Sequence, residues 1–129
     1  MKELSAVYGE NEYRITGRAI LCDEDVILVF GGGTRSHVGA VSMAVYEPER
    51  RSATVSTMTV YGHRDDELAS RSAKKASSRL GCTVVSCVGI HLNGATEAQI
   101  GILSRNFSAC FKELLRVIEE DMKVFYEQH

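Results

Sequence analysis

Apolar residues recur at helical spacing over the last third of the chain, and no other feature constrains the fold as strongly. The pattern follows a capping box, in which Thr96 and Gln99 can each bond the other's backbone N–H, and it predicts one helix over about residues 96–126. Its apolar face consists of Ile100, Leu103, Phe107, Cys110, Phe111, Leu114, Ile118 and Phe125. We expect this face to pack on the core. Beyond Leu114 it can outrun a small sheet, and a leftover apolar edge there would indicate a dimer contact.

Six other segments have the composition of β-strands and are bounded by turn residues. The expected strands are residues 4–8, 13–21, 26–30, 37–46, 52–61 and 82–90. The connections among the first five are too short for crossover helices, so neighbouring strands should be antiparallel. Residues 26–30 are continuously apolar, which predicts a strand that is buried on both faces.

A second helix is expected between the last two strands. Asp65 can cap it, and Gly81 suits the position just past its end. Its apolar face carries Leu68, Ala69, Ala73, Ala76 and Leu80. Together the elements predict an α+β fold, in which a mainly antiparallel sheet of about six strands packs against two helices, the C-terminal one long. A length of 129 residues suits a single domain over residues 1–129.

The composition argues against several classes of protein. Hydrophobic residues make up 44% of the chain and the net charge is −2, which is typical of a folded domain. Lysine and arginine are scattered, and the densest basic group, Lys74, Lys75 and Arg79, suits a solvated helix face. We therefore expect no nucleic-acid partner. The longest apolar run, residues 26–30, is far too short to span a bilayer, so we expect no membrane partner.

The chain is expected to be cytoplasmic. It opens Met1-Lys2-Glu3-Leu4, without the apolar region of a secretory signal. A domain of this size does not need disulfides. Cys82, Cys87 and Cys110 fall on apolar stretches of a predicted strand and helix, which indicates reduced cysteines in the core.

Three histidines share one setting, because each lies where a strand meets a loop. His37 follows a triple glycine, His63 precedes the first helix, and His91 ends a strand before the second helix. Functional side chains concentrate at such loops, so converging strand ends would gather all three around one small site. Two alternatives stay open, namely a metal site of three imidazoles and three separate polar residues. The spacings match no metal-binding signature, which favours the second alternative over the first.

Glycines and helix starts offer places for an anion. Gly31-Gly32-Gly33 fits neither the dinucleotide fingerprint nor the P-loop, but its N–H groups could form an anion nest beside Arg35. The alternative is a flexible turn that interrupts the strand. Residues 93–96 and 62–65 begin the two helices, where free N–H groups and the helix dipole favour anions. Ordinary capping explains both segments as well, and no nucleophile–base motif accompanies them.

Three short motifs carry a resemblance to a known family. They are His37-Val38-Gly39-Ala40-Val41 after the glycines, Gly62-His63-Arg64-Asp65-Asp66, and Gly89-Ile90-His91-Leu92-Asn93-Gly94-Ala95-Thr96. In this order the chain resembles the LpdD-like prenylated flavin chaperones, the small accessory D subunits of UbiD-type hydroxyaryl decarboxylases such as gallate decarboxylase. Two positions depart from the pattern, since Arg64 stands where lysine is usual and Gly94 where aspartate is usual. The second change removes a carboxylate and weakens a metal or acid–base role there.

The resemblance implies a fold similar to proteasome assembly chaperones and a non-catalytic role in holding or delivering prenylated FMN, or FMN, to a UbiD-type decarboxylase. It implies binding by His37, His63, His91 and Asn93. The phosphate could rest on Gly32, Gly33, Arg35 or the helix start at Arg64, and Tyr46, Tyr61 and Phe30 are candidates for an apolar wall. A homodimer is expected. The rival functions are a small metal-dependent enzyme that uses His37, His63 and His91, and an assembly module without a ligand.

Overall fold

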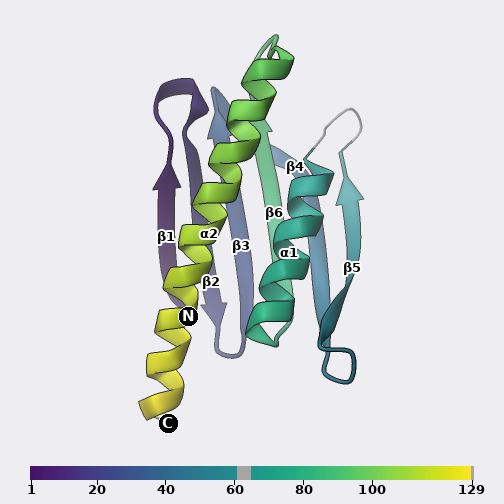
Figure 1. The fold of residues 1–129 in the computed structure, drawn as a ribbon, viewed down its shortest axis with the longest axis vertical. Coiled ribbons are helices and arrows are strands. Elements are labelled where there is room, and N and C mark those ends of the chain that lie inside the picture. Colours follow the sequence, from purple (N-terminus) through teal and green to yellow (C-terminus); the bar gives the residue numbers. More distant parts are fainter. Residues whose placement is uncertain (61–64, 129) are drawn as a thin grey trace.

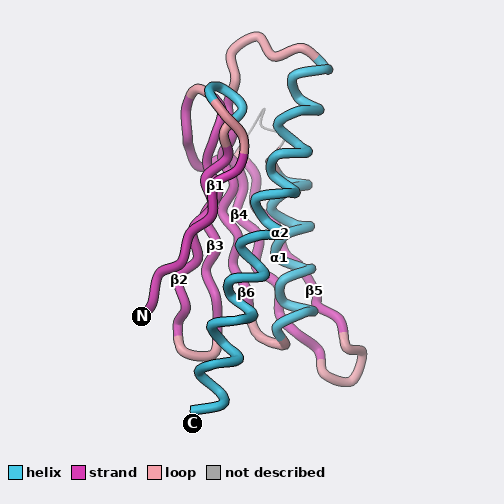
Figure 2. Tube along the Cα trace, turned by 60° about the vertical axis from the view of Figure 1, so that its left-hand side comes forward, coloured by secondary structure: helices cyan, strands magenta, loops and turns pink. Residues whose placement is uncertain are grey.

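The structure is a two-layer α+β fold with both helices on one face of a six-stranded sheet, as the sequence predicts. The computed structural model describes residues 1–60 and 65–128, without the side chains of residues 125 and 126. In Figure 1 the helices lie in front of the sheet, and the turned view of Figure 2 separates the two layers. Neither helix of the described residues lies on the far face of the sheet.

The elements follow the predicted order. The strands are β1 (Lys2–Tyr8), β2 (Ile15–Cys22), β3 (Asp25–Gly33), β4 (Arg35–Glu47), β5 (Ser52–Thr59) and β6 (Val84–His91). The helices are α1 (Asp66–Leu80) and α2 (Glu97–Gln128), and a short 3-10 helix, η1 (Asn11–Tyr13), joins β1 to β2. The capping box is confirmed, because the Gln99 N–H donates to Thr96 Oγ1 over 3.1 Å and the Thr96 N–H donates to Gln99 Oε1 over 2.9 Å.

The strand order β1-β2-β3-β6-β4-β5 corrects one prediction about pairing. Consecutive strands were expected to be antiparallel neighbours, but β6 lies between β3 and β4 and pairs parallel with β3. The other pairs are antiparallel. The cause is α1, which carries the chain from β5 at one edge back to the middle of the sheet. Short-range connection lengths could not reveal this long-range insertion.

The core lies between the helices and the sheet face that they cover. Phe30 of β3 is 1% exposed and meets the rings of Phe107 and Phe111 from α2 edge-on, with centroids 4.7 and 6.1 Å apart. Alternate residues of β6, such as Val84 and Val88, are fully buried on the same face. The predicted stripe of α2 is therefore core, except that Ile100 is exposed and Phe125 lies outside the described side chains.

The far half of α2 does not leave the apolar edge that would have indicated a dimer contact. Leu115, Ile118 and Met122 are all buried. They pack in the same cluster as Ala6 of β1 and Leu21 of β2. Among the described side chains of this helix, the large apolar ones that are exposed, Ile100 and Val124, lie far apart along it. The large exposed apolar surface of the chain lies elsewhere.

That surface is the side of the sheet away from the helices, called here the open face. It includes Ile27 and Val29 of β3, which are 37% and 41% exposed, whereas Leu28 between them is fully buried. Residues 26–30 were expected to be buried on both faces, and in this single chain only one face is covered. The apolar side chains of the open face are Ile20, Ile27, Val29, Val41, Met43, Val45, Met58, Val85 and Cys87.

Candidate functional site

A bulge between β4 and β6 forms the most unusual local structure in the sheet. The register runs from Ser36 opposite Ile90 to Ala40 opposite Val88, so residues 37–39 of β4 lie opposite Gly89 alone. Two extra residues must therefore arch out of β4. Bulges of this kind turn side chains in new directions next to functional sites, and here the side chain involved is His37.

Two glycines make the bulge possible. A Cβ on Gly89 would lie 1.4 Å from the backbone oxygen of His37, and a Cβ on Gly39 would lie 2.0 Å from Asp65 Oδ2. No side chain can occupy either place. Gly39 and Gly89 belong to two of the motifs found in the sequence, so the structure gives a steric reason for both.

Asp65 enters this bulge from the start of α1. It stands at the N-cap position, as predicted, but its side chain makes no capping hydrogen bond. Instead Oδ1 accepts the N–H of Ile90 over 3.2 Å, and Oδ2 lies 3.8 Å from His37 Nε2. The residue is only 5% exposed. A buried carboxylate needs partners of this kind, and in return it fixes the position of the His37 ring.

His91, at the end of β6, completes the group. Its ring stands edge-on to that of His37 with centroids 6.0 Å apart, and its Nε2 lies 2.6 Å from Asn93 Oδ1. Arg35 is directly opposite His91 in the β4–β6 register, so the two side chains share one face of the sheet. We call His37, Asp65, His91 and Asn93 the bulge site, with Arg35 exposed beside it.

The structure thus brings together five residues of the sequence analysis, including Asp65, which was expected only to cap a helix. The signal that could have found Asp65 is its place in the second motif, next to His63 and Arg64. Those last two residues lie outside the described part of the chain, so their predicted roles stay predictions.

Gly32 and Gly33 are placed differently from the flexible turn considered above. Both lie within β3, which continues to Gly33. The Gly33 N–H donates to Arg14 O over 3.3 Å, and the Thr34 N–H donates to His91 O over 2.8 Å. These donors already serve the protein's own carbonyls, so the nest proposed for the phosphate has fewer N–H groups to offer than the sequence suggested.

The three aromatic residues considered for the apolar wall of a flavin site lie in different surroundings. Phe30 faces the helix-covered core and cannot line a surface site. Tyr46 is half-buried near the far end of β4, opposite Ala53. Tyr61 lies outside the described residues. On the face of the sheet that carries His91, the nearest apolar side chain of β6 is instead that of Cys87, four residues earlier in the strand.

A family model described as the prenylated flavin chaperone LpdD-like domain matches residues 9–119 of this chain. That match covers most of the 129 residues and all three motifs. The chain belongs to this family. The resemblance noted in the sequence is therefore confirmed, and the family description agrees with the expected chaperone class.

A solved structure shares the fold of this LpdD-like domain. It comes from a crystal structure described as a novel chaperone complex for yeast 20S proteasome assembly, and the match has a TM-score of 0.60 at 16% sequence identity. It covers 92% of this chain and 95% of that chain. The likeness confirms the predicted assembly-chaperone-like fold. No curated protein matches this LpdD-like domain significantly in sequence.

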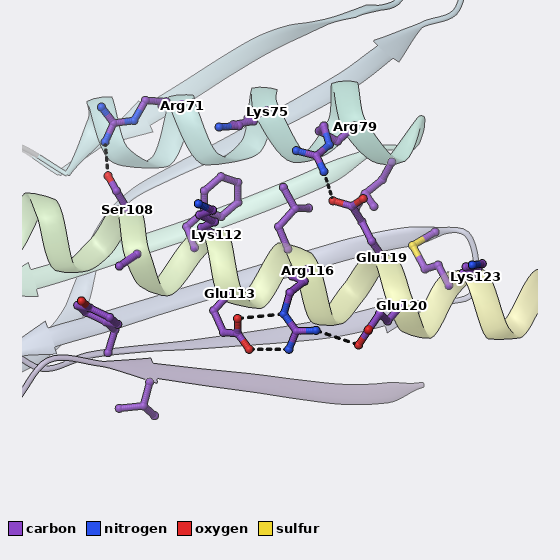
Figure 3. A pocket seen from close by; sticks show the side chains of 17 residues that line it. Arg71, Lys75, Arg79, Ser108, Lys112, Glu113, Arg116, Glu119, Glu120 and Lys123 are labelled. Carbon is purple, nitrogen blue, oxygen red and sulfur yellow. Dashed lines mark hydrogen bonds and ion pairs between the residues drawn. The ribbon is translucent and has the colours of Figure 1, made fainter.

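A large hollow of the LpdD-like domain lies away from the bulge site. It is a groove of about 1230 Å³ along the helical layer, where Figure 3 shows the side chains of α1 and α2 facing each other. Its apolar lining comes from Leu80, Phe111, Leu115 and Met122, among others. Six cations and three carboxylates also line it, so the groove carries a positive charge although the whole chain has a charge of −2.

Half of those cations are already occupied. Arg79 Nη2 lies 2.6 Å from Glu119 Oε1, and Arg116 pairs with Glu113 and Glu120 along α2 (Figure 3). Arg71 Nη1 lies 3.9 Å from Glu67 Oε1 within α1. The lysines of the groove, at positions 75, 112 and 123, carry no ion pair within the described residues. The chemistry suits an anionic group, so the groove is a second place where a phosphate could bind. It contains none of the residues of the three motifs.

Within residues 1–60 and 65–128, three or more His, Cys, Asp or Glu side chains nowhere gather closely enough to hold a metal ion. His63, the third histidine of the metal alternative, is not among those residues. Neither described helix is both long and apolar enough to cross a bilayer.

Proposed function

We propose that this single domain is a non-catalytic accessory protein that holds prenylated FMN, or FMN, at the bulge site and delivers it to a UbiD-type decarboxylase in the cytoplasm. The observation that carries the proposal is the meeting of three motifs at one bulge. His37 and Gly39 come from the first motif, Asp65 from the second, and Gly89 and His91 from the third. Segments more than 20 residues apart along the chain converge on one small group of polar side chains.

The chemistry of these side chains suits a flavin phosphate better than a metal ion. Imidazole and amide groups can donate to or accept from the polar edge of the isoalloxazine. Arg35 supplies a fixed positive charge next to His91, as a phosphate requires. Asp65 is turned inward toward Ile90 and His37, which supports a positioning role rather than contact with an anionic ligand. When bound, the prenylated flavin would supply the reactive ring, and these residues would only hold it.

The sequence lacks the G-x-S-x-G motif that presents a hydrolase nucleophile, which agrees with a carrier rather than an enzyme. The four cysteines are free, which suits a reducing compartment. The expected homodimer is a proposal separate from flavin binding.

The test is flavin retention. The protein should be co-expressed with a flavin prenyltransferase and analysed by native mass spectrometry and by its visible absorbance. The wild-type chain should retain a flavin mass, and His91→Ala or His37→Ala should lower the retained fraction at least tenfold. The melting temperature of His91→Ala should stay within a few degrees of the wild-type value. Lys74→Ala, an exposed change on α1 outside the groove lining, should have no effect.

Equal flavin retention by the histidine variants and the wild type would rule out the bulge site. Loss of flavin from a Lys75→Glu, Lys112→Glu double variant alone would move the binding site to the groove between the helices. Stoichiometric zinc or iron in the purified protein, with no flavin, would favour the metal-dependent enzyme instead.

A further inference from the structure

The open face is a continuous apolar surface across five strands. The register aligns Ile20 of β2 with Ile27 of β3, and Ile27 with Val85 of β6. Val85 is opposite Met43 of β4. A second row runs from Val29 through Cys87 and Val41 to Met58. Side chains directly opposite one another touch, so these rows form one patch rather than scattered residues.

This patch departs from what an antiparallel sheet in water usually shows. Sheets with one face covered by helices normally alternate apolar and polar side chains along each strand. Here β3 and β6 are apolar on both faces. Met43 and Val45 of β4 are both 48% exposed, and Met58 of β5 is 81% exposed. Contiguous exposed patches of this kind mark association surfaces in soluble proteins.

We infer that the open face binds the open face of a second copy of this chain, so that two sheets stack as a β-sandwich with the helices outside. A sheet face is broad and gently twisted, and another such face packs against it at a separation of about 10 Å with the side chains interdigitated. Both faces of β3 are then buried in the dimer, as its continuously apolar sequence predicts.

The size of the patch fits a dimer of this kind. Five strands about 4.8 Å apart and three rows of side chains about 6.8 Å apart cover roughly 500 Å². A standard interface buries about 800 Å² per partner, and about 65% of it is apolar in homodimers. The apolar patch with its polar margin therefore supplies about the area that a stable homodimer needs.

The charge of the patch also favours a second copy. Its two central rows contain one charged side chain, Arg18, at the β2 margin, where Nη1 lies 3.5 Å from Glu3 Oε1. A neutral surface meets its own copy without like-charge repulsion, whereas a partner of opposite charge would gain nothing from it. The charged groove between α1 and α2 lies on the other side of the sheet and stays accessible in this dimer.

The experiment compares two valine-to-glutamate variants. Val29 and Val124 are 41% and 50% exposed in the single chain, but only Val29 lies on the open face. Sedimentation and light scattering at micromolar concentration should give the wild type and Val124→Glu twice the chain mass of 14.2 kDa. Val29→Glu should be a folded monomer, because an unpaired carboxylate in the interface weakens association by roughly 100-fold or more.

A polar double variant, Ile27→Ser with Met43→Ser, keeps the inference testable if Val29→Glu does not fold. It removes apolar area without adding charge and should also shift the mass toward the monomer, with an unchanged circular dichroism spectrum. A monomeric wild-type chain, or a Val29→Glu dimer, would overturn the inference. Flavin retention is a separate readout, so the proposed function and the dimer can fail independently.

Discussion

The two faces of the central sheet are made from the same strands and similar residues, yet they meet different surroundings. In β3, Val26, Leu28 and Phe30 lie under the helices and are at most 2% exposed. Ile27 and Val29, between them, lie on the open face and are 37% and 41% exposed. The continuously apolar sequence of β3 therefore indicates a strand with both faces buried. The helices of one chain bury only one of those faces.

The side chains on the two faces also suit different packing partners, namely the helices of the same chain and a second sheet. The covered face is specified by aromatic packing, in which Phe30 meets Phe107 and Phe111. The open face has aliphatic and sulfur-containing side chains without aromatic rings among those that define it. Such a face can associate with another sheet without a detailed fit, and the stability of the single chain depends on the other face. Substitutions on the covered face should therefore change monomer stability, whereas those on the open face should change self-association.

The largest effect is expected from neighbouring residues of β3. Phe30→Ala should lower the free energy of unfolding by about 3–5 kcal/mol, because it empties the centre of the core. Val29→Ala should cost less than about 1 kcal/mol when the protein is dilute enough to be monomeric. Urea denaturation of both variants gives the two values. Similar losses for both residues in the monomer would remove the distinction between the faces.

The next largest effect concerns the bulge, where the open face meets the candidate site. Gly89→Ala should cost about 1–3 kcal/mol or more, since its Cβ would overlap the backbone oxygen of His37. Gly101→Ala in α2 is the matched control and should stabilise the protein by about 0.5–1 kcal/mol, because its nearest neighbour is the flexible end of Arg105 at 3.4 Å. Thermal unfolding of the two variants should therefore shift in opposite directions.

A smaller effect is expected from changing valine to threonine on each face. Val84 of β6 is fully buried under the helices, and a hydroxyl there should cost about 1–2 kcal/mol because it enters an apolar core. Val45 of β4 is 48% exposed, and Val45→Thr should change monomer stability by less than about 0.5 kcal/mol. The same variant should weaken self-association at higher concentration. An equal cost at both positions in the monomer would indicate that the open face is covered within one chain.

The sequence was sufficient for most of the fold and for part of the site. Local periodicity and the Thr96–Gln99 capping box predicted both helices and six strands, since these depend on neighbours along the chain. The insertion of β6 between β3 and β4 depends on contacts between distant segments, so no local pattern could show it. The inward turn of Asp65 has the same origin, because a residue that looks like a cap finds its partners in β6 and β4.

The last prediction concerns the pH dependence of stability and two cysteines on opposite faces of the sheet. Burial raises the pKa of the Cys110 thiol from 9.0 to about 11 under the helices. The folded chain then keeps this proton between pH 9 and 11, where the unfolded chain loses it, so stability is complete below pH 9 and falls as the pH rises through this window. Cys110→Ala should flatten that fall without removing it, because burial also raises the pKa of Cys82 to about 11.

Cys87 provides the matching measurement on the open face. Burial and the nearby charge of Asp65 raise the pKa of its thiol too, but it is only half-buried, whereas Cys110 is fully buried and its Sγ lies 3.5 Å from Ala6 O. A thiol reagent should therefore modify Cys87 well before Cys110 in dilute native protein, because the Cys87 side chain is the more accessible of the two. At higher concentration the second copy covers Cys87, and its rate should fall while that of Cys110 stays the same. A Cys87 rate that does not depend on concentration would mean that no second sheet covers this face.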